Sequence, residues 1–80
     1  MSKDLLDLHG CRAEEVIDRV DRFIMRANEM DLKRVRIMTG KGKGIVQKTV
    51  IEYLKLGRFP WQFDKNGKTV NEGVLVVFLG

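Results

Sequence analysis

The sequence predicts one α/β domain over residues 1–80, a two-layer sandwich in the order strand, helix, strand, helix, strand, strand. Two segments carry apolar residues at helical spacing, and four short apolar runs end at glycines or polar turn residues. A chain of 80 residues buries one modest core and has no room for a second. Right-handed crossovers would place both helices on one face of a mixed four-stranded sheet, and the other face would stay open.

The first strand and helix are expected between residues 5 and 30. Residues 5–9 form a short apolar run that Gly10 ends, which predicts a strand with one buried face. Apolar side chains then recur at helical spacing within residues 12–30, at Val16, Val20, Phe23, Ile24 and Ala27. Glu14 and Glu15 lie near the start of this helix, where the helix dipole favours anions.

A glycine- and lysine-rich turn separates the second strand from the second helix. Residues 35–39 predict the strand, and Gly40-Lys41-Gly42-Lys43-Gly44, here called the basic turn, follows it. Helical spacing resumes at Val46, Val50, Tyr53 and Leu54. Gly57 then stands where a C-terminal cap would lie.

The last quarter of the chain predicts a hairpin. Its two apolar runs, residues 59–63 and 74–79, are separated by a polar stretch that contains Asn66-Gly67. Pro60 has no amide donor, which favours an edge position for the third strand. The continuous apolar run after Gly73 favours an interior position for the fourth strand.

Charge is unevenly distributed along the chain. Residues 1–31 carry five basic and eight acidic side chains, whereas residues 32–80 carry ten basic and three acidic ones. No acid occurs between residues 32 and 51, where the basic residues are Lys33, Arg34, Arg36, Lys41, Lys43 and Lys48. This stretch predicts a docking surface for a polyanion such as nucleic acid, and a merely solvated basic face is the alternative.

Cysteine usage and hydropathy exclude several classes of protein. The one cysteine, Cys11, forms no internal disulfide, and no Cys and His cluster has the spacing of a structural zinc site. No long hydrophobic segment is present that would act as a signal or span a bilayer. We therefore expect a cytoplasmic protein with no membrane partner.

Alternation along the first strand separates its side chains into two sets. If Leu6 and Leu8 face the helices, Asp7 and His9 face the open side of the sheet. His9 then lies at the C-terminal end of its strand, beside the basic turn that ends the neighbouring parallel strand, where open α/β sheets bind ligands. His9 is a candidate for proton transfer, and a histidine that holds its turn by a hydrogen bond is the alternative. Asp7 is equally compatible with a carboxylate bonded to the backbone.

The basic turn predicts an anion site. Its alternating glycines allow backbone amides to point into one concavity, and the following helix N-terminus adds partial positive charge. Lys41 and Lys43 add full charges, and Arg36 and Lys48 flank the turn. The spacing fits neither a Walker A loop nor a dinucleotide-binding turn. A tight connection without a ligand is the alternative.

Two motifs together, Leu6-Asp7-Leu8-His9-Gly10 and Thr39-Gly40-Lys41-Gly42, resemble the paired signatures of the Smr (small MutS-related) domain family. The resemblance spans nearly the whole chain. It implies a sandwich like the C-terminal domain of bacterial translation initiation factor three, with the fourth strand beside the second. It also implies nicking endonuclease activity on DNA or RNA. His9 and Asp7 map onto the first motif, and Gly40, Lys41 and Gly42 onto the second. Thr39 stands where many members have histidine.

The single histidine restricts the chemistry that the sequence supports. We expect no metal and no cofactor, because no cluster of carboxylates or histidines is visible that would hold an ion. RNA supplies its own nucleophile, the 2′-hydroxyl, so one imidazole with phosphate-binding groups suffices for cleavage. This argument favours RNA, whereas the resemblance leaves DNA and RNA open.

Two other functions remain compatible with the sequence. One is a non-catalytic module that binds nucleic acid or a ribosomal surface through the same basic turn, with His9 as a structural residue. The other is a dimerisation domain that uses the open face of its sheet. Salt-sensitive binding of nucleic acid separates the first of these from the second.

Overall fold

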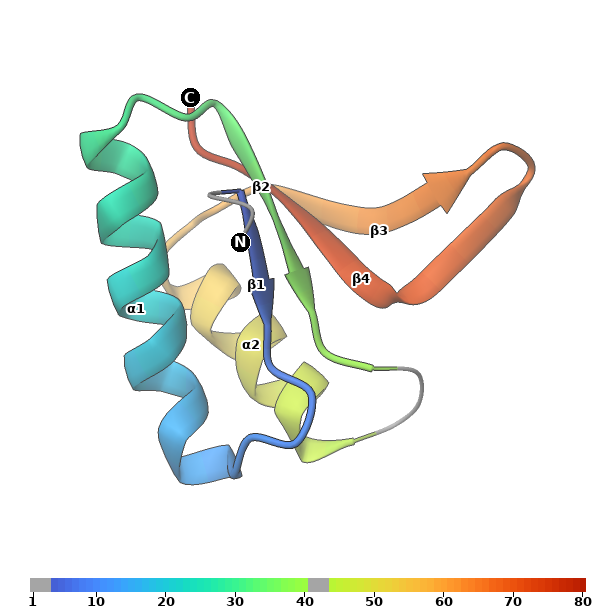
Figure 1. Cartoon of the computed structure of the whole chain (residues 1–80), viewed down its shortest axis with the longest axis horizontal. Helices are drawn as coiled ribbons and strands as arrows, with labels where there is room; N and C mark the ends of the chain where they lie inside the picture. The colour runs from blue at the N-terminus through green and yellow to red at the C-terminus, as the bar shows by residue number, and fades with distance from the viewer. Residues whose placement is uncertain (1–3, 41–43) are drawn as a thin grey trace.

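The computed structural model describes residues 4–40 and 44–80 of the chain. The elements are β1 (Leu5–Asp7), α1 (Ala13–Glu29), β2 (Arg34–Met38), α2 (Ile45–Leu56), β3 (Trp61–Asn66) and β4 (Thr69–Phe78), as Figure 1 shows. The sheet order is β1-β2-β4-β3, with β1 and β2 parallel and the other two pairs antiparallel. The predicted element order and mixed four-stranded sheet are confirmed, with β4 interior and β3 at an edge.

The core lies between the helices and one face of the sheet. On the sheet side, Val35 pairs with Val77 and Ile37 with Leu75, and all four side chains are buried. Both helices contribute to the same cluster, through Val16, Val20, Ile24 and Ala27 of α1 and Val50 and Leu54 of α2. These four sheet residues share one face of the sheet, so both helices cover that face and neither covers the opposite one, where Val74 and Val76 of β4 are also buried.

The first strand ends earlier than the sequence predicts, at Asp7 and not at His9. Leu8 still donates its amide to the carbonyl of Met38, at 2.8 Å, before the chain turns. The expected alternation nevertheless holds, because Leu8 is fully buried while Asp7 and His9 are exposed.

The hairpin of β3 and β4 is longer than predicted. Its strands extend through the polar stretch to a two-residue turn at Gly67 and Lys68, where Gly67 has a φ of 65°. The sequence predicts a loop here because the residues are polar. They are polar because this distal part of the hairpin covers no core. Figure 1 shows it projecting away from the helices.

The hairpin bends where β4 has extra residues. Phe63 pairs with Leu75, yet the next residue of β3, Asp64, pairs with Asn71. Residues 72–74 of β4 therefore form a bulge, and bulges bend the strand that carries them. This segment is called the β4 bulge below.

The two helices are also joined by a polar contact. The Tyr53 hydroxyl of α2 donates to Asp21 Oδ1 of α1, at 2.6 Å. The Tyr53 ring stacks on Phe59, with ring centroids 6.3 Å apart. Neither α1 nor α2 has the length and apolar character of a membrane-crossing segment, in the part of the chain that the structure describes.

Candidate functional site

The first and second strands end side by side, which brings the two sequence motifs to one edge of the sheet. Asp7 pairs with Met38 in the parallel register, so His9 follows β1 where Thr39 and Gly40 follow β2. The N-terminus of α2 lies at the same end of the molecule, in the lower part of Figure 1. This juxtaposition agrees with the one expected from the sequence.

Asp7 holds the turn that carries His9. The backbone amide of His9 donates to Asp7 Oδ1 at 2.8 Å, and the amide of Cys11 donates to the Leu8 carbonyl at 3.0 Å. Gly10 has a φ of 83°, which the third position of a type II turn requires. Among the described residues, the His9 imidazole has no hydrogen-bond or ion-pair partner, so the turn is held by the carboxylate and the imidazole is left exposed.

The start of the basic turn is fastened to the β4 bulge. The amides of Thr39 and Gly40 both donate to the Gly73 carbonyl, at 2.9 and 3.2 Å. Gly40 has a φ of 84°, a backbone conformation that favours glycine. The half-buried Thr39 hydroxyl donates to the Gly40 carbonyl at 3.3 Å and accepts from Gln47 Nε2 at the same distance. Within the described contacts, Thr39 thus supports the turn from inside.

The far end of the basic turn is the N-cap of α2, at Gly44. No side chain caps this helix, and its first turn contains no acidic residue. By contrast, Glu14 and Glu15 lie in the first turn of α1. The partial positive charge of the α2 N-terminus is therefore not offset by an acidic residue in the first turn, as expected for an anion-binding end. Lys41, Gly42 and Lys43, which the sequence assigns to the same site, lie outside the described residues.

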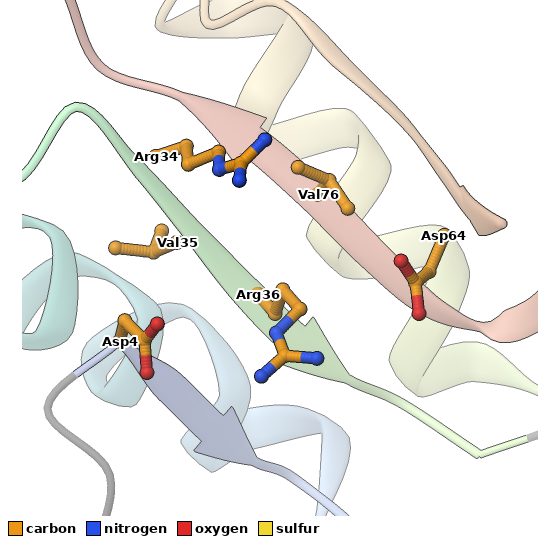
Figure 2. Close-up of a pocket in the computed structure, with 6 residues that line it drawn as sticks. All are labelled: Asp4, Arg34, Val35, Arg36, Asp64 and Val76. Atoms are coloured by element: carbon orange, nitrogen blue, oxygen red, sulfur yellow. The ribbon is translucent and has the colours of Figure 1, made fainter. Parts of the chain in front are cut away.

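The two flanking basic residues lie on different surfaces. Lys48 is exposed on α2 and lines an open groove of about 380 Å³ together with Gly44, Gln47, Lys55 and one acid, Glu52. Arg36 projects from the open face of the sheet (Figure 2), into a cavity of about 260 Å³ that it shares with Arg34. Lys48 is therefore close to the basic turn, whereas Arg36 lies farther up β2, level with Leu5.

Acidic side chains on both sides of the sheet-face cavity reduce its net charge. Asp4 and Asp64 line it on opposite sides of Arg36 in Figure 2. Asp7 follows on the same face of β1. Of the two surfaces, the α2 N-terminal end is consequently the more favourable one for a phosphate.

In the acidic N-terminal third of the chain, as far as the structure describes it, three of the four arginines form ion pairs with nearby acids. Three ion pairs lie on the exposed start and surface of α1, namely Arg12–Glu14, Arg19–Glu15 and Arg22–Asp18. Within the described residues, no ion pair engages Arg34, Arg36 or Lys48. The surplus positive charge of the second half is thus available to a partner.

Sequence reasoning missed Gln47 and the β4 bulge. Gln47 Nε2 donates to the Glu72 carbonyl at 2.5 Å, a contact between residues 25 positions apart. No local pattern signals such a contact. A signal did exist for the bulge itself, because Asn71 Oδ1 accepts from the Gly73 amide at 3.0 Å, and Asn-x-Gly is typical of such turns.

The described residues contain no group of three or more His, Cys, Asp or Glu side chains placed to hold a metal ion. The chemical groups assembled at this edge are thus one exposed imidazole, one carboxylate, a helix N-terminus without a cap and basic side chains. Such a set can bind a phosphate and move a proton.

The Smr domain family model matches residues 6–80 of the chain. Among curated relatives, the chain is 38% identical over 71 residues to endonuclease MutS2 of Staphylococcus epidermidis, covering 89% of this chain and 9% of that protein. It is 36% identical over 73 residues to endonuclease MutS2 of Finegoldia magna, covering 91% of this chain and 9% of that protein. The chain thus spans less than a tenth of the length of these relatives.

Two solved structures share the fold over nearly the whole chain. The Smr domain of Thermus thermophilus MutS2 has a TM-score of 0.83 and 28% identity, covering 96% of this chain and 98% of that one. YdaL, a stand-alone small MutS-related protein from Escherichia coli, has a TM-score of 0.85 and 24% identity. The match covers 99% of this chain and 66% of YdaL. At this identity the similarity is one of fold alone.

Proposed function

Because the chain belongs to the Smr domain family, we propose that it is an endonuclease that binds nucleic acid and cleaves a phosphodiester bond. The observation that carries the proposal is the exposed His9 beside the start of the basic turn and the N-terminus of α2. The relatives named endonuclease MutS2 support the reaction class.

The proposed roles rest on the geometry of the sheet edge and, for Lys41 and Lys43, on the sequence alone. The α2 N-terminus and the basic turn, with Lys41, Lys43 and Lys48, bind the phosphate. His9 transfers a proton at the reacting oxygen, and Asp7 positions His9 through its backbone amide. Binding the phosphate at a helix N-terminus also stabilises the negative charge that develops during cleavage.

Cleavage of RNA requires fewer catalytic groups beyond this set of residues than cleavage of DNA does. In that reaction, His9 accepts the proton of the 2′-hydroxyl, the 2′-oxygen bonds to phosphorus, and the bond to the 5′-oxygen breaks. The leaving 5′-oxygen then takes a proton from solvent or from the protonated imidazole. Cleavage of DNA needs an activated water in place of the 2′-hydroxyl.

Incubation of the purified chain with labelled single- and double-stranded DNA and RNA tests the proposal. We expect cleavage that persists in the presence of a chelator and is lost in His9→Ala. Tight, salt-sensitive binding with no cleavage of any of these substrates would instead favour a binding module for nucleic acid or the ribosome. The presence of a single histidine in the chain is the observation that favours this second function.

A further inference from the structure

We propose that Gln47 is a positioning residue, which fixes the start of the basic turn relative to the N-terminus of α2. The inference rests on the proposed function, because it concerns how the phosphate site keeps its shape. Gln47 belongs to neither of the two sequence motifs.

The carboxamide of Gln47 joins three elements. It projects from the first turn of α2, and its Nε2 donates to the Glu72 carbonyl of β4 at 2.5 Å. The same nitrogen donates to Thr39 Oγ1, directly after β2, at 3.3 Å. An amide nitrogen has two hydrogens, so these two bonds use its full donor capacity.

Thr39 passes this constraint to the turn. Its hydroxyl donates to the Gly40 carbonyl at 3.3 Å, and its amide and that of Gly40 share the Gly73 carbonyl. The β4 bulge that offers this carbonyl is itself held by the bond from the Gly73 amide to Asn71 Oδ1. Gly40, at one end of the basic turn, is thus bonded to the bulge through its backbone, while Gln47 bonds α2, at the other end, to the same bulge and to Thr39.

The position of Gln47 also separates its role from that of the lysines. Its side chain is neutral, so it adds no counterion release to nucleic-acid binding. Both of its donor hydrogens are already directed at protein oxygens. Its effect on binding therefore comes from the geometry of Thr39 and Gly40.

Substitution of Gln47 by methionine tests the proposal, because methionine keeps the length of the side chain and removes the donors. The probes are a short fluorescein-labelled DNA duplex and a labelled single-stranded RNA. We expect Gln47→Met to weaken binding by about three- to tenfold, the effect of one or two neutral hydrogen bonds. Gln62→Met, on the exposed surface of β3, is the matched control and should bind like the unmodified chain.

Substitutions of Thr39 test the same link from its other end. Thr39→Val removes the hydroxyl and leaves the bond from Gln47 to Glu72 possible, so it decides the question if Gln47→Met does not fold. Thr39→Val should weaken binding and Thr39→Ser should retain it. The double variant of Gln47→Met and Thr39→Val should bind about as well as the weaker single variant, because residues in one network are not additive.

Three results separate failure of this inference from failure of the proposed function. Unchanged binding in Gln47→Met, with lost binding in Lys41→Ala, would overturn the inference alone. Full additivity of the Gln47 and Thr39 effects would also overturn it. An unmodified chain that binds neither probe at low salt would overturn the proposed function and this inference with it.

Discussion

The backbone amide of His9 donates to the carboxylate of Asp7 at 2.8 Å, so the acid of the first motif fixes the backbone of its histidine. The imidazole is thereby left exposed beside the residues that begin the basic turn. Two roles of the Asp7 carboxylate are distinguishable: it holds the turn through its hydrogen bond, or it supplies a negative charge beside the substrate. They predict different results for substitutions of Asp7.

We expect Asp7→Asn to retain the turn, since the amide oxygen of asparagine still accepts from the His9 amide. Asp7→Ala removes the acceptor and should reduce stability by about 0.5–1.5 kcal/mol. Cleavage should follow the same order, with Asn close to the unmodified chain and Ala much slower. Urea unfolding and initial cleavage rates check this. Equal loss of cleavage in both variants would show that the negative charge is needed.

His9→Ala should fold normally and bind nucleic acid nearly as well as the unmodified chain. The side chain is exposed, and such substitutions change stability by less than about 0.5 kcal/mol. Loss of a proton-transfer group slows a reaction by about 10²- to 10⁴-fold, so cleavage should drop by this factor. Thermal unfolding, affinity and cleavage rate are measured on the same preparation. A variant that unfolds identifies a structural histidine, and a variant that cleaves at the original rate rules out this catalytic role.

Replacement of both Lys41 and Lys43 by alanine should flatten the salt dependence of binding. Each phosphate contact releases about one counterion, so the slope of log affinity against log salt for duplex DNA should change by about two. The matched control is the double substitution of Lys65 and Lys68 at the far part of the hairpin, which removes the same charge away from the site. Equal changes of slope in the two variants would contradict a local role for the basic turn.

Of the two described ends of the basic turn, Gly40 and Gly44, Gly40 should tolerate a side chain less well. Its φ of 84° is unfavourable for alanine, although no atom lies within 4 Å of an added Cβ. Gly40→Ala should therefore cost about 1–2 kcal/mol of stability through backbone strain alone. Gly40→Asn should cost less, because asparagine tolerates this conformation better. Equal stability of both variants and the unmodified chain would show that the turn readjusts freely.

Most of the fold is predictable from the sequence because the patterns that identify its helices and strands are local. Helical spacing, glycine punctuation and the apolar run of β4 identify the elements, and strand alternation correctly exposes Asp7 and His9. The parallel register then brings the two motifs together. These features depend on residues that are near one another in the chain or on general rules of chain connection.

The remaining features depend on contacts between distant residues. The distal hairpin has no buried face, so hydrophobic alternation cannot reveal its strands. Gln47 meets Glu72 and Thr39 only because the fold brings the β4 bulge and the end of β2 to the first turn of α2. Gly57 is the C-cap of α2, as the sequence predicts, but its φ is −82° and a Cβ there would lie 2.6 Å from the Phe59 ring. Glycine is thus needed at this position for space, and the positive φ occurs at Arg58.

The bond between Tyr53 and Asp21 predicts a loss of stability at alkaline pH. Burial, the hydrogen bond to Asp21 and the charge of Asp21 raise the pKa of Tyr53 to about 12. An unfolded tyrosine has a pKa of about 10. Between these values the folded chain retains a proton that the unfolded chain loses, so stability falls as the pH rises through this window. Below the unfolded pKa, the stabilisation from this group is fully present.

Tyr53 is the one tyrosine of the chain, so its ionisation can be followed directly by the absorbance of tyrosinate. We expect a midpoint in the folded protein well above that of the urea-unfolded chain. Tyr53→Phe should lose about 0.5–1.5 kcal/mol of stability near neutral pH, because it removes the bond that joins α1 and α2. The variant should also lose less stability than the unmodified chain on going to alkaline pH. Coincident tyrosinate midpoints in the folded and unfolded chain would contradict the link between this bond and stability.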